Sequence, residues 1–101
     1  MDEVQLKLDE KNKGAFYIME GKEQVGEMVI SISGSDLTVY HTEVSPGAQG
    51  KGLAKNLLGA MVAYARSHSL KVIPLCPYVH VQFKRHPEEY NDIWKKDRVS
   101  G

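Results

Sequence analysis

The stretch SPGAQGKGLAK, residues 45–55, places three glycines and two lysines between a strand-like segment and a helix-like one. The first N–H groups of a helix have no intrahelical partner and carry partial positive charge. Glycine lets the chain turn and brings its backbone close to a bulky anion. The pattern predicts a phosphate-binding turn, although Gly47, Gly50 and Gly52 could also form only a tight turn that starts the helix.

Two well-known phosphate-binding loops do not fit the spacing of these residues. A nucleoside-triphosphate loop requires Gly-x-x-x-x-Gly-Lys-Ser/Thr. Here Gly50-Lys51 is followed by Gly52, and Ser45 stands five positions before Gly50. A dinucleotide-binding loop requires Gly-x-Gly-x-x-Gly, but Lys55 occupies the last glycine position. The spacing therefore excludes both classes.

The segments on either side of the turn predict an α+β domain. Apolar and polar residues alternate before it, with short turns between the runs, which is typical of an antiparallel meander of four strands. An apolar stripe at helical spacing follows it and leads into a fifth, nearly continuous apolar strand. A crossover through a helix favours a parallel pairing of the fourth and fifth strands. Strands are expected at residues 4–8, on either side of Gly21-Lys22, at 37–44 and at 70–76, with an irregularity near Gly26. A long helix is expected at 51–68, and short helices separated at Pro87 follow the last strand.

Length and composition limit the functions that this chain can have. Its 101 residues predict one domain, residues 1–101, since domains usually contain about 100–150 residues. The 13 basic and 13 acidic side chains balance, so no net field attracts nucleic acid or a membrane surface. No apolar run approaches the roughly 20 residues that span a bilayer. A single cysteine gives no internal disulfide, and a cytoplasmic location is expected.

Gln49-x-x-Gly52-x-Ala54, preceded by Val44-x-Pro46, resembles motif A of the GCN5-related N-acetyltransferases, usually written Gln/Arg-x-x-Gly-x-Gly/Ala. The longer pattern HTEVSPGAQGKGLAKNLL…KVIPLCPYVHVQFKRHPEEY resembles a subgroup of very small acetyltransferase-like proteins. That subgroup carries a His-Thr-x-Val strand, the glycine turn, a Pro-Leu-Cys-Pro strand end and an Arg-His-Pro-Glu segment. The resemblance covers nearly the whole chain and implies the acyl-CoA N-acyltransferase fold.

The resemblance implies that acetyl-CoA binds as cosubstrate between the fourth and fifth strands. The pyrophosphate would lie on the backbone amides of the glycine turn, and the pantetheine would lie along Thr42 to Val44. Arg85 is a further phosphate partner by its charge. The implied cofactor-binding residues are Thr42, Val44, Gln49, Gly50, Lys51, Gly52, Leu53, Ala54, Lys55 and Arg85.

Four residues are candidates for the chemistry of acetyl transfer. His41 and Glu43 share one strand face and could deprotonate the amine that attacks the thioester. Cys76 could instead accept the acetyl group first, or be a buried small hydrophobe. The resemblance implies that Tyr78 could reprotonate the leaving thiolate, but Tyr78 could equally be a packing aromatic. The single cysteine and four scattered histidines lack zinc-site spacing, so we expect no metal.

The chain also departs from full-size members of the family. They carry two helices after their first strand that help to form the acceptor site, whereas here a hairpin replaces them. The acceptor, a small-molecule or protein amine, therefore cannot be named, and the chain is expected to be a monomer or a weak homodimer. A non-catalytic CoA-binding module that assists a partner is the alternative function, and a structural protein that binds no ligand is a third.

Overall fold

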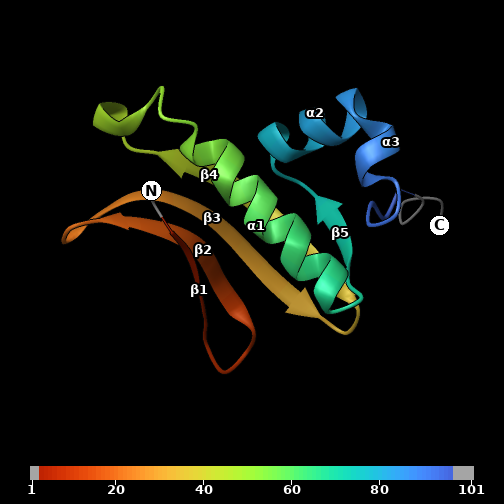
Figure 1. The fold of residues 1–101 in the computed structure, drawn as a ribbon. Helices are drawn as coiled ribbons and strands as arrows, with labels where there is room; N and C mark the ends of the chain where they lie inside the picture. The colour runs from red at the N-terminus through yellow and green to blue at the C-terminus, as the bar shows by residue number, and fades with distance from the viewer. Residues whose placement is uncertain (1–2, 97–101) are drawn as a thin grey trace.

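The computed structural model describes residues 3–96, and the single domain of residues 1–101 stays a prediction. The chain forms one five-stranded sheet with the strand order β1-β2-β3-β4-β5 (Figure 1). The first three pairings are antiparallel and the pairing of β4 with β5 is parallel, which confirms the predicted α+β architecture. The elements are β1 Val4–Leu8, β2 Lys13–Glu20, β3 Glu23–Ser33, β4 Asp36–Val44, the 3₁₀ turn η1 Pro46–Ala48, α1 Leu53–Ser67, β5 Lys71–Pro74, α2 Pro77–Arg85 and α3 Pro87–Tyr90.

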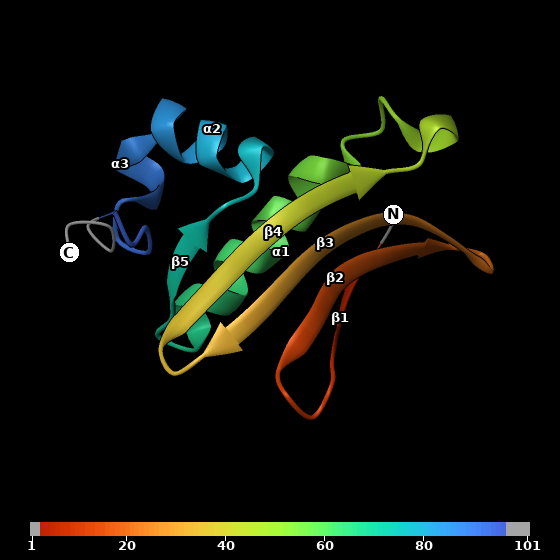
Figure 2. The same ribbon diagram turned by 180° about the vertical axis from the view of Figure 1, so that it is seen from behind.

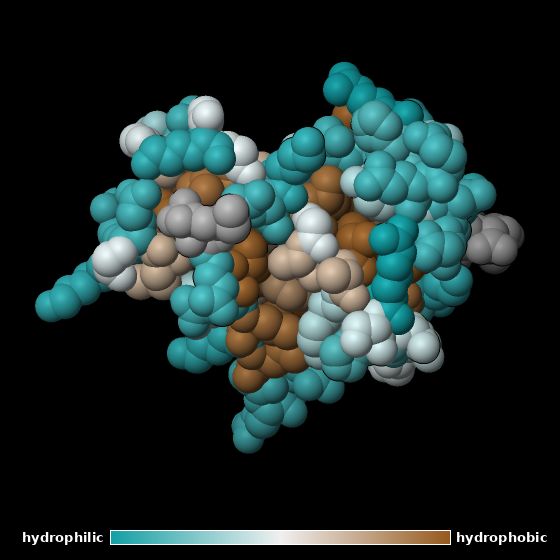
Figure 3. Space-filling view, in the orientation of Figure 1, coloured by the Kyte–Doolittle hydropathy of each residue, from teal (hydrophilic) through white to brown (hydrophobic). Residues whose placement is uncertain are grey.

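Helix α1 covers one face of the sheet, and the view from behind shows the strands of the opposite face without a helix over them (Figure 2). The core lies between α1 and the sheet and extends under α2. In the orientation of Figure 1, a band of apolar surface also runs through the middle of the helix-covered face (Figure 3). The largest fully buried side chains are Ile18, Met28, Ile30, Leu37, Val39, Leu57, Met61, Val72, Cys76, Val79 and Phe83.

Two irregularities interrupt the sheet register. Ile18 pairs with Gly26 but Met19 pairs with Gln24, which confirms the irregularity expected near Gly26. The second was not predicted: Ile30 pairs with Val39 and Val29 pairs with His41, so Tyr40 is an extra residue in β4. Such a bulge changes which face the following side chains occupy.

Helix α1 begins two residues later than the sequence pattern predicts. Gly50 and Gly52 adopt φ values of 88° and 76°, which belong to the left-handed region and not to a right-handed helix. The apolar stripe of α1 is buried as expected, including Leu53, Leu57 and Met61. The backbone conformation of the two glycines therefore sets where α1 begins. Its apolar face sets which side of the helix packs on the sheet.

The C-terminal segment covers the end of the core beside β5. Pro77 and Pro87 each occupy the first turn of a short helix, where the missing N–H costs no hydrogen bond. The separation of the two helices at Pro87 was predicted. Tyr90 and Ile93 are buried, and the Tyr90 ring stacks on Phe83 with 4.8 Å between centroids. The Val72 amide donates to the Ile93 carbonyl. These contacts hold this segment over the core.

An ion pair fixes this tail to α1 and predicts a pH effect. Arg66 Nε donates to Asp92 Oδ2 at 2.9 Å, which holds the pKa of Asp92 below its ordinary value of 3.8. The pair therefore stabilises the fold at pH values above about 4 and this contribution is lost as the pH falls. Both side chains are about half exposed, so we expect less than about 1 kcal/mol.

Carboxyl NMR titration tests this contact directly. Arg66→Gln should raise the Asp92 midpoint toward 3.8, whereas Lys51→Gln, which removes a different exposed ion pair with Glu20, should leave it unchanged. An unchanged Asp92 midpoint in Arg66→Gln would contradict the assignment.

Candidate functional site

The glycine turn lies where β4 ends and α1 begins, as the sequence predicts. The 3₁₀ turn η1 follows β4, and Gly52 then forms the N-cap of α1 in a left-handed conformation. A Cβ atom added at Gly47, Gly50 or Gly52 would meet no other atom within 4 Å. The positive φ values of Gly50 and Gly52 favour glycine at these two positions. The space outside all three glycines is open to a ligand.

The backbone amides of this turn are available to an anion. Asn56 is the first residue whose N–H bonds back into the turn, to the Gly52 carbonyl at 3.0 Å. Within residues 3–96, the amides of residues 50–55 donate no hydrogen bond to a protein acceptor. A helix N-terminus with free N–H groups attracts negative charge. The turn therefore has the chemistry that a pyrophosphate requires.

The side chains predicted to accompany the turn have different environments. Gln49, Lys51 and Lys55 are exposed, Ala54 is half-buried, and Leu53 is a buried member of the core. Lys51 Nζ pairs with Glu20 at 3.2 Å, so its charge is partly compensated. Arg85 is the exposed last residue of α2, a helix that runs away from the glycine turn (Figures 1 and 2). Its contact with phosphate stays a prediction.

Strands β4 and β5 are paired over only part of their length. The parallel ladder ends at Val39, and the Cys76 amide donates to the Val39 carbonyl at 2.9 Å. Beyond this point β4 continues through Thr42 to Val44 with β3 on one side and no paired strand on the other within the described residues. The free edge of β4 leads directly into the glycine turn.

Cys76 and Tyr78 lie where the two strands separate. Thr42 Oγ1 and Cys76 Sγ are 3.3 Å apart, within hydrogen-bond distance. Cys76 is only 1% exposed, which agrees with the interpretation of this residue as a buried small side chain. Burial, and to a smaller extent the neighbouring Cys76, raises the pKa of Tyr78. Tyr78 therefore keeps its proton at neutral pH and is a competent hydrogen-bond donor.

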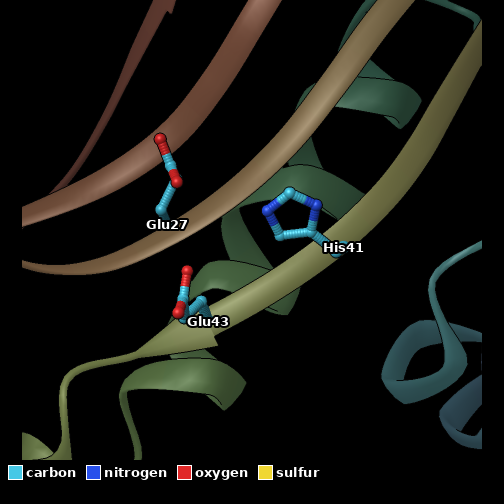
Figure 4. Close-up of side chains that lie close together, drawn as sticks. All are labelled: Glu27, His41 and Glu43. Carbon is cyan, nitrogen blue, oxygen red and sulfur yellow. The ribbon is translucent and has the colours of Figure 1, made fainter.

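His41 and Glu43 lie on the opposite face of the sheet from Thr42. The residue pairs explain this, because Thr42 pairs with the fully buried Met28, whereas Glu43 pairs with the outward-facing Glu27. One ligating atom from each of Glu27, His41 and Glu43 lies within 4.8 Å of the others (Figure 4). The sequence prediction that His41 and Glu43 share a face is confirmed.

Glu27 is the member of this cluster that the sequence analysis missed. The register of the hairpin between β3 and β4 places Glu27 opposite Glu43. Counting residue pairs outward from the Gly34-Ser35 turn is the signal in the sequence that could have found it. Because Tyr40 is an extra residue in β4, that count would pair Glu27 with Thr42 instead. The candidate site thus has two parts: Thr42, Cys76 and Tyr78 near the strand opening, and Glu27, His41 and Glu43 on the helix-free face.

Comparison with known proteins identifies this arrangement. Residues 15–93 match the family model described as GCN5-related N-acetyl-transferase. A GCN5-like N-acetyltransferase candidate from Staphylococcus aureus superposes with a TM-score of 0.61 at 30% identity, covering 89% of this chain and 86% of that one. Each comparison supports the fold assigned above.

Two larger enzymes share the fold at lower identity. The ribosomal-protein-S18-alanine N-acetyltransferase of Escherichia coli gives a TM-score of 0.60 at 13% identity, and the chain spans 43% of its length. The ribosomal-protein-alanine N-acetyltransferase of Brucella melitensis gives 0.60 at 21% identity over 62% of its length. The match over residues 15–93 decides the family, and this protein belongs to the GCN5-related N-acetyltransferases.

Proposed function

We propose that the protein transfers an acetyl group from acetyl-CoA to an amine. The observation that carries this proposal is the free edge of β4, which leads through η1 to the amides of residues 50–55, for which the described residues supply no acceptor. The turn would bind the pyrophosphate through the amides of residues 50–54, since the Gln49 amide already donates to the Pro46 carbonyl at 3.4 Å. The pantetheine arm would extend the sheet beside Thr42 to Val44, since an unpaired strand edge offers N–H and C=O groups to an extended ligand.

The chemistry requires a neutral amine, whereas a free alkylamine with a pKa near 10.4 is protonated at neutral pH. His41, with Glu43 beside it, would take the proton as the nitrogen attacks the thioester carbonyl. The new N–C bond forms, the C–S bond breaks, and Tyr78 would protonate the departing thiolate. The Tyr78 hydroxyl suits this step because burial raises its pKa and keeps it protonated.

This direct route does not need Cys76 as an acetyl carrier. The Cys76 side chain is almost completely buried and its Sγ contacts Thr42 Oγ1, which favours a packing role. We therefore predict that Cys76→Ala retains acetyl transfer within about threefold of the unmodified protein, as for a volume change that perturbs packing only. A continuous thiol-release assay measures the rate.

Mass spectrometry separates the two routes independently. Incubation with acetyl-CoA alone should leave the protein mass unchanged under the direct route. One added acetyl group that disappears in Cys76→Ala, together with loss of turnover in that variant, would establish a covalent intermediate at Cys76 instead.

Calorimetric titration with acetyl-CoA and with CoA tests the first requirement of the proposal. We expect binding of both at sub-millimolar concentration, and the absence of binding would overturn the proposal. Turnover with a panel of primary amines tests the second requirement. Binding without turnover of any amine would favour a non-catalytic CoA-binding module. Within residues 3–96, β1 is followed directly by β2 and not by a pair of helices, which would suit such a module.

The proposed reaction uses no metal, although two carboxylates and an imidazole can in principle bind a cation. We predict that treatment with a chelator followed by dialysis leaves both acetyl-CoA affinity and the rate of acetyl transfer unchanged. Elemental analysis of the protein before and after treatment is the control. A loss of activity that Zn²⁺ restores would assign a metal to Glu27, His41 and Glu43.

A further inference from the structure

The helix-free face of the sheet carries an open groove whose residues can be followed from strand to strand. Cross-strand pairing places Lys7, Ala15, Val29 and His41 in one row running from β1 to β4. The neighbouring row is Gln5, Tyr17, Glu27 and Glu43. A hollow of about 900 Å³ opens over these strands. Its lining includes Lys7, Lys13, Ala15, Tyr17, Glu27, Val29 and Tyr40.

Short side chains form the floor of the groove, and a tyrosine stands on each side of it. Ala15 and Val29 are neighbours in the first row, and their short side chains leave room above the sheet. Tyr17 stands on one side, where its hydroxyl donates to Gln5 Oε1 at 3.4 Å. Tyr40 stands on the other, with its hydroxyl 2.7 Å from Ser31 Oγ. An extended aliphatic chain could therefore lie across the strands between two tyrosine rings.

Glu27 lines one end of the groove, and His41 and Glu43 lie beside it on β4, which suits this end to a cation. Glu27 and Glu43 are directly opposite each other on β3 and β4, an arrangement in which like charges repel. None of the ion pairs formed within residues 3–96 involves either carboxylate. His41 completes the cluster (Figure 4). A protonated amine placed between the carboxylates would remove their repulsion.

The other end of the groove is suited to an anion. Lys7 and Lys13 line it, and neither ammonium group forms an ion pair within the described chain. Asp9 is nearby, but its Oδ1 accepts hydrogen bonds from the amides of Lys11 and Lys13. The positive charges of the two lysines therefore exceed the negative charge at this end. Two strand spacings, about 10 Å, separate β1 from β3.

We propose that this groove binds the acetyl acceptor, and that the acceptor is a primary amine carrying an anionic group about 10 Å from the nitrogen, such as an ω-amino acid or a short peptide. The amine lies at Glu27, His41 and Glu43, and the anionic group lies at Lys7. This inference rests on the proposed function for the identity of the ligand as an acceptor. The charge pattern of the groove supplies the substrate class.

NMR titration of the CoA-bound protein with three probes tests the charge pattern without requiring turnover. The probes are 6-aminohexanoate, hexylamine and 1,6-diaminohexane, which share one chain length and differ in the far group. We expect 6-aminohexanoate to bind at least about fivefold more tightly than either amine, as one favourable ion pair allows. Amide shifts should follow the row that contains Ala15 and Val29.

Lys7→Gln should lower the affinity for 6-aminohexanoate to that of hexylamine, and Glu27→Gln should weaken all three probes. Lys11→Gln is the matched control, because Lys11 is an exposed lysine close to this end of the groove but outside its lining. Equal or tighter binding of 1,6-diaminohexane, shifts confined to other surfaces, or an unchanged affinity in Lys7→Gln would each overturn the inference. The absence of binding by all three probes would also overturn it.

The acetylation assay then distinguishes this inference from the proposed function. Transfer to hexylamine with no advantage for 6-aminohexanoate would contradict the proposed acceptor class and would leave the acetyltransferase function supported. If the probes bind as expected but no amine is acetylated, the groove remains a ligand site and the acetyltransferase function is contradicted.

Discussion

Replacing Gly52 by aspartate is expected to weaken CoA binding by at least about a hundredfold, because a carboxylate would face the pyrophosphate at the start of α1. Two like charges about 4 Å apart repel by roughly 4 kcal/mol near a protein surface, and about 2.7 kcal/mol already corresponds to a hundredfold. A Cβ atom at this position would meet no other atom within 4 Å, so a steric clash does not contribute, and the strain of a positive φ is matched in the control below. Isothermal titration with CoA measures the change.

Gly34→Asp is the matched control for this variant. Gly34 also has a positive φ, 59° against 76° for Gly52, and also faces open space. Both variants therefore introduce the same side chain into the same backbone region and should lower the thermal midpoint by a similar small amount. Gly34→Asp should bind CoA normally. Equal affinity of the two variants for CoA would show that the turn does not bind the pyrophosphate.

The second large effect is expected at His41. His41→Gln should lower kcat for acetyl transfer by about a hundredfold at neutral pH, the lower end of what a positioned general base contributes. The CoA affinity should stay unchanged because His41 lies on the sheet face opposite Thr42. Steady-state kinetics with saturating amine, together with a CoA titration, separate the two effects. His86→Gln, a change at another exposed histidine, is the control.

The same assay decides which of the paired residues accepts the proton. A loss of less than about threefold in His41→Gln would contradict its assignment as the base. A larger loss in Glu43→Gln than in His41→Gln would transfer the role to Glu43. Parallel losses in the two variants would indicate that the pair acts as one unit.

The sequence predicted the fold well because the decisive signals are local. The alternating runs, the turn residues and the apolar stripe of α1 each act within a few neighbouring residues, and the structure confirms the elements that they indicate. The delayed start of α1 was missed because it depends on the backbone angles of Gly50 and Gly52. Those angles are compatible with glycine but are not dictated by it.

The candidate site was predicted less completely because it depends on pairing between distant residues. Glu27 joins His41 and Glu43 only through the register of β3 on β4, and a register shift of one residue reverses every side chain. Cys76 meets Thr42 through a parallel crossover of more than thirty residues. The motif around Gln49 indicated the cofactor class, but no local signal indicated which face the base occupies.

The extra residue at Tyr40 decides which face of the sheet carries the proposed base. Leu37 and Val39 face the core, so unbroken alternation from them would turn residues 41 and 43 inward and residue 42 outward. The bulge absorbs one residue, which keeps His41 and Glu43 on the helix-free face and Thr42 opposite the buried Met28. A chain without Tyr40 would pass directly from Val39 to His41 and would keep these faces, but it would lose one of the two tyrosine rings beside the groove. Length variation at this point can therefore reshape the acceptor groove while the motif His-Thr-Glu-Val keeps its orientation.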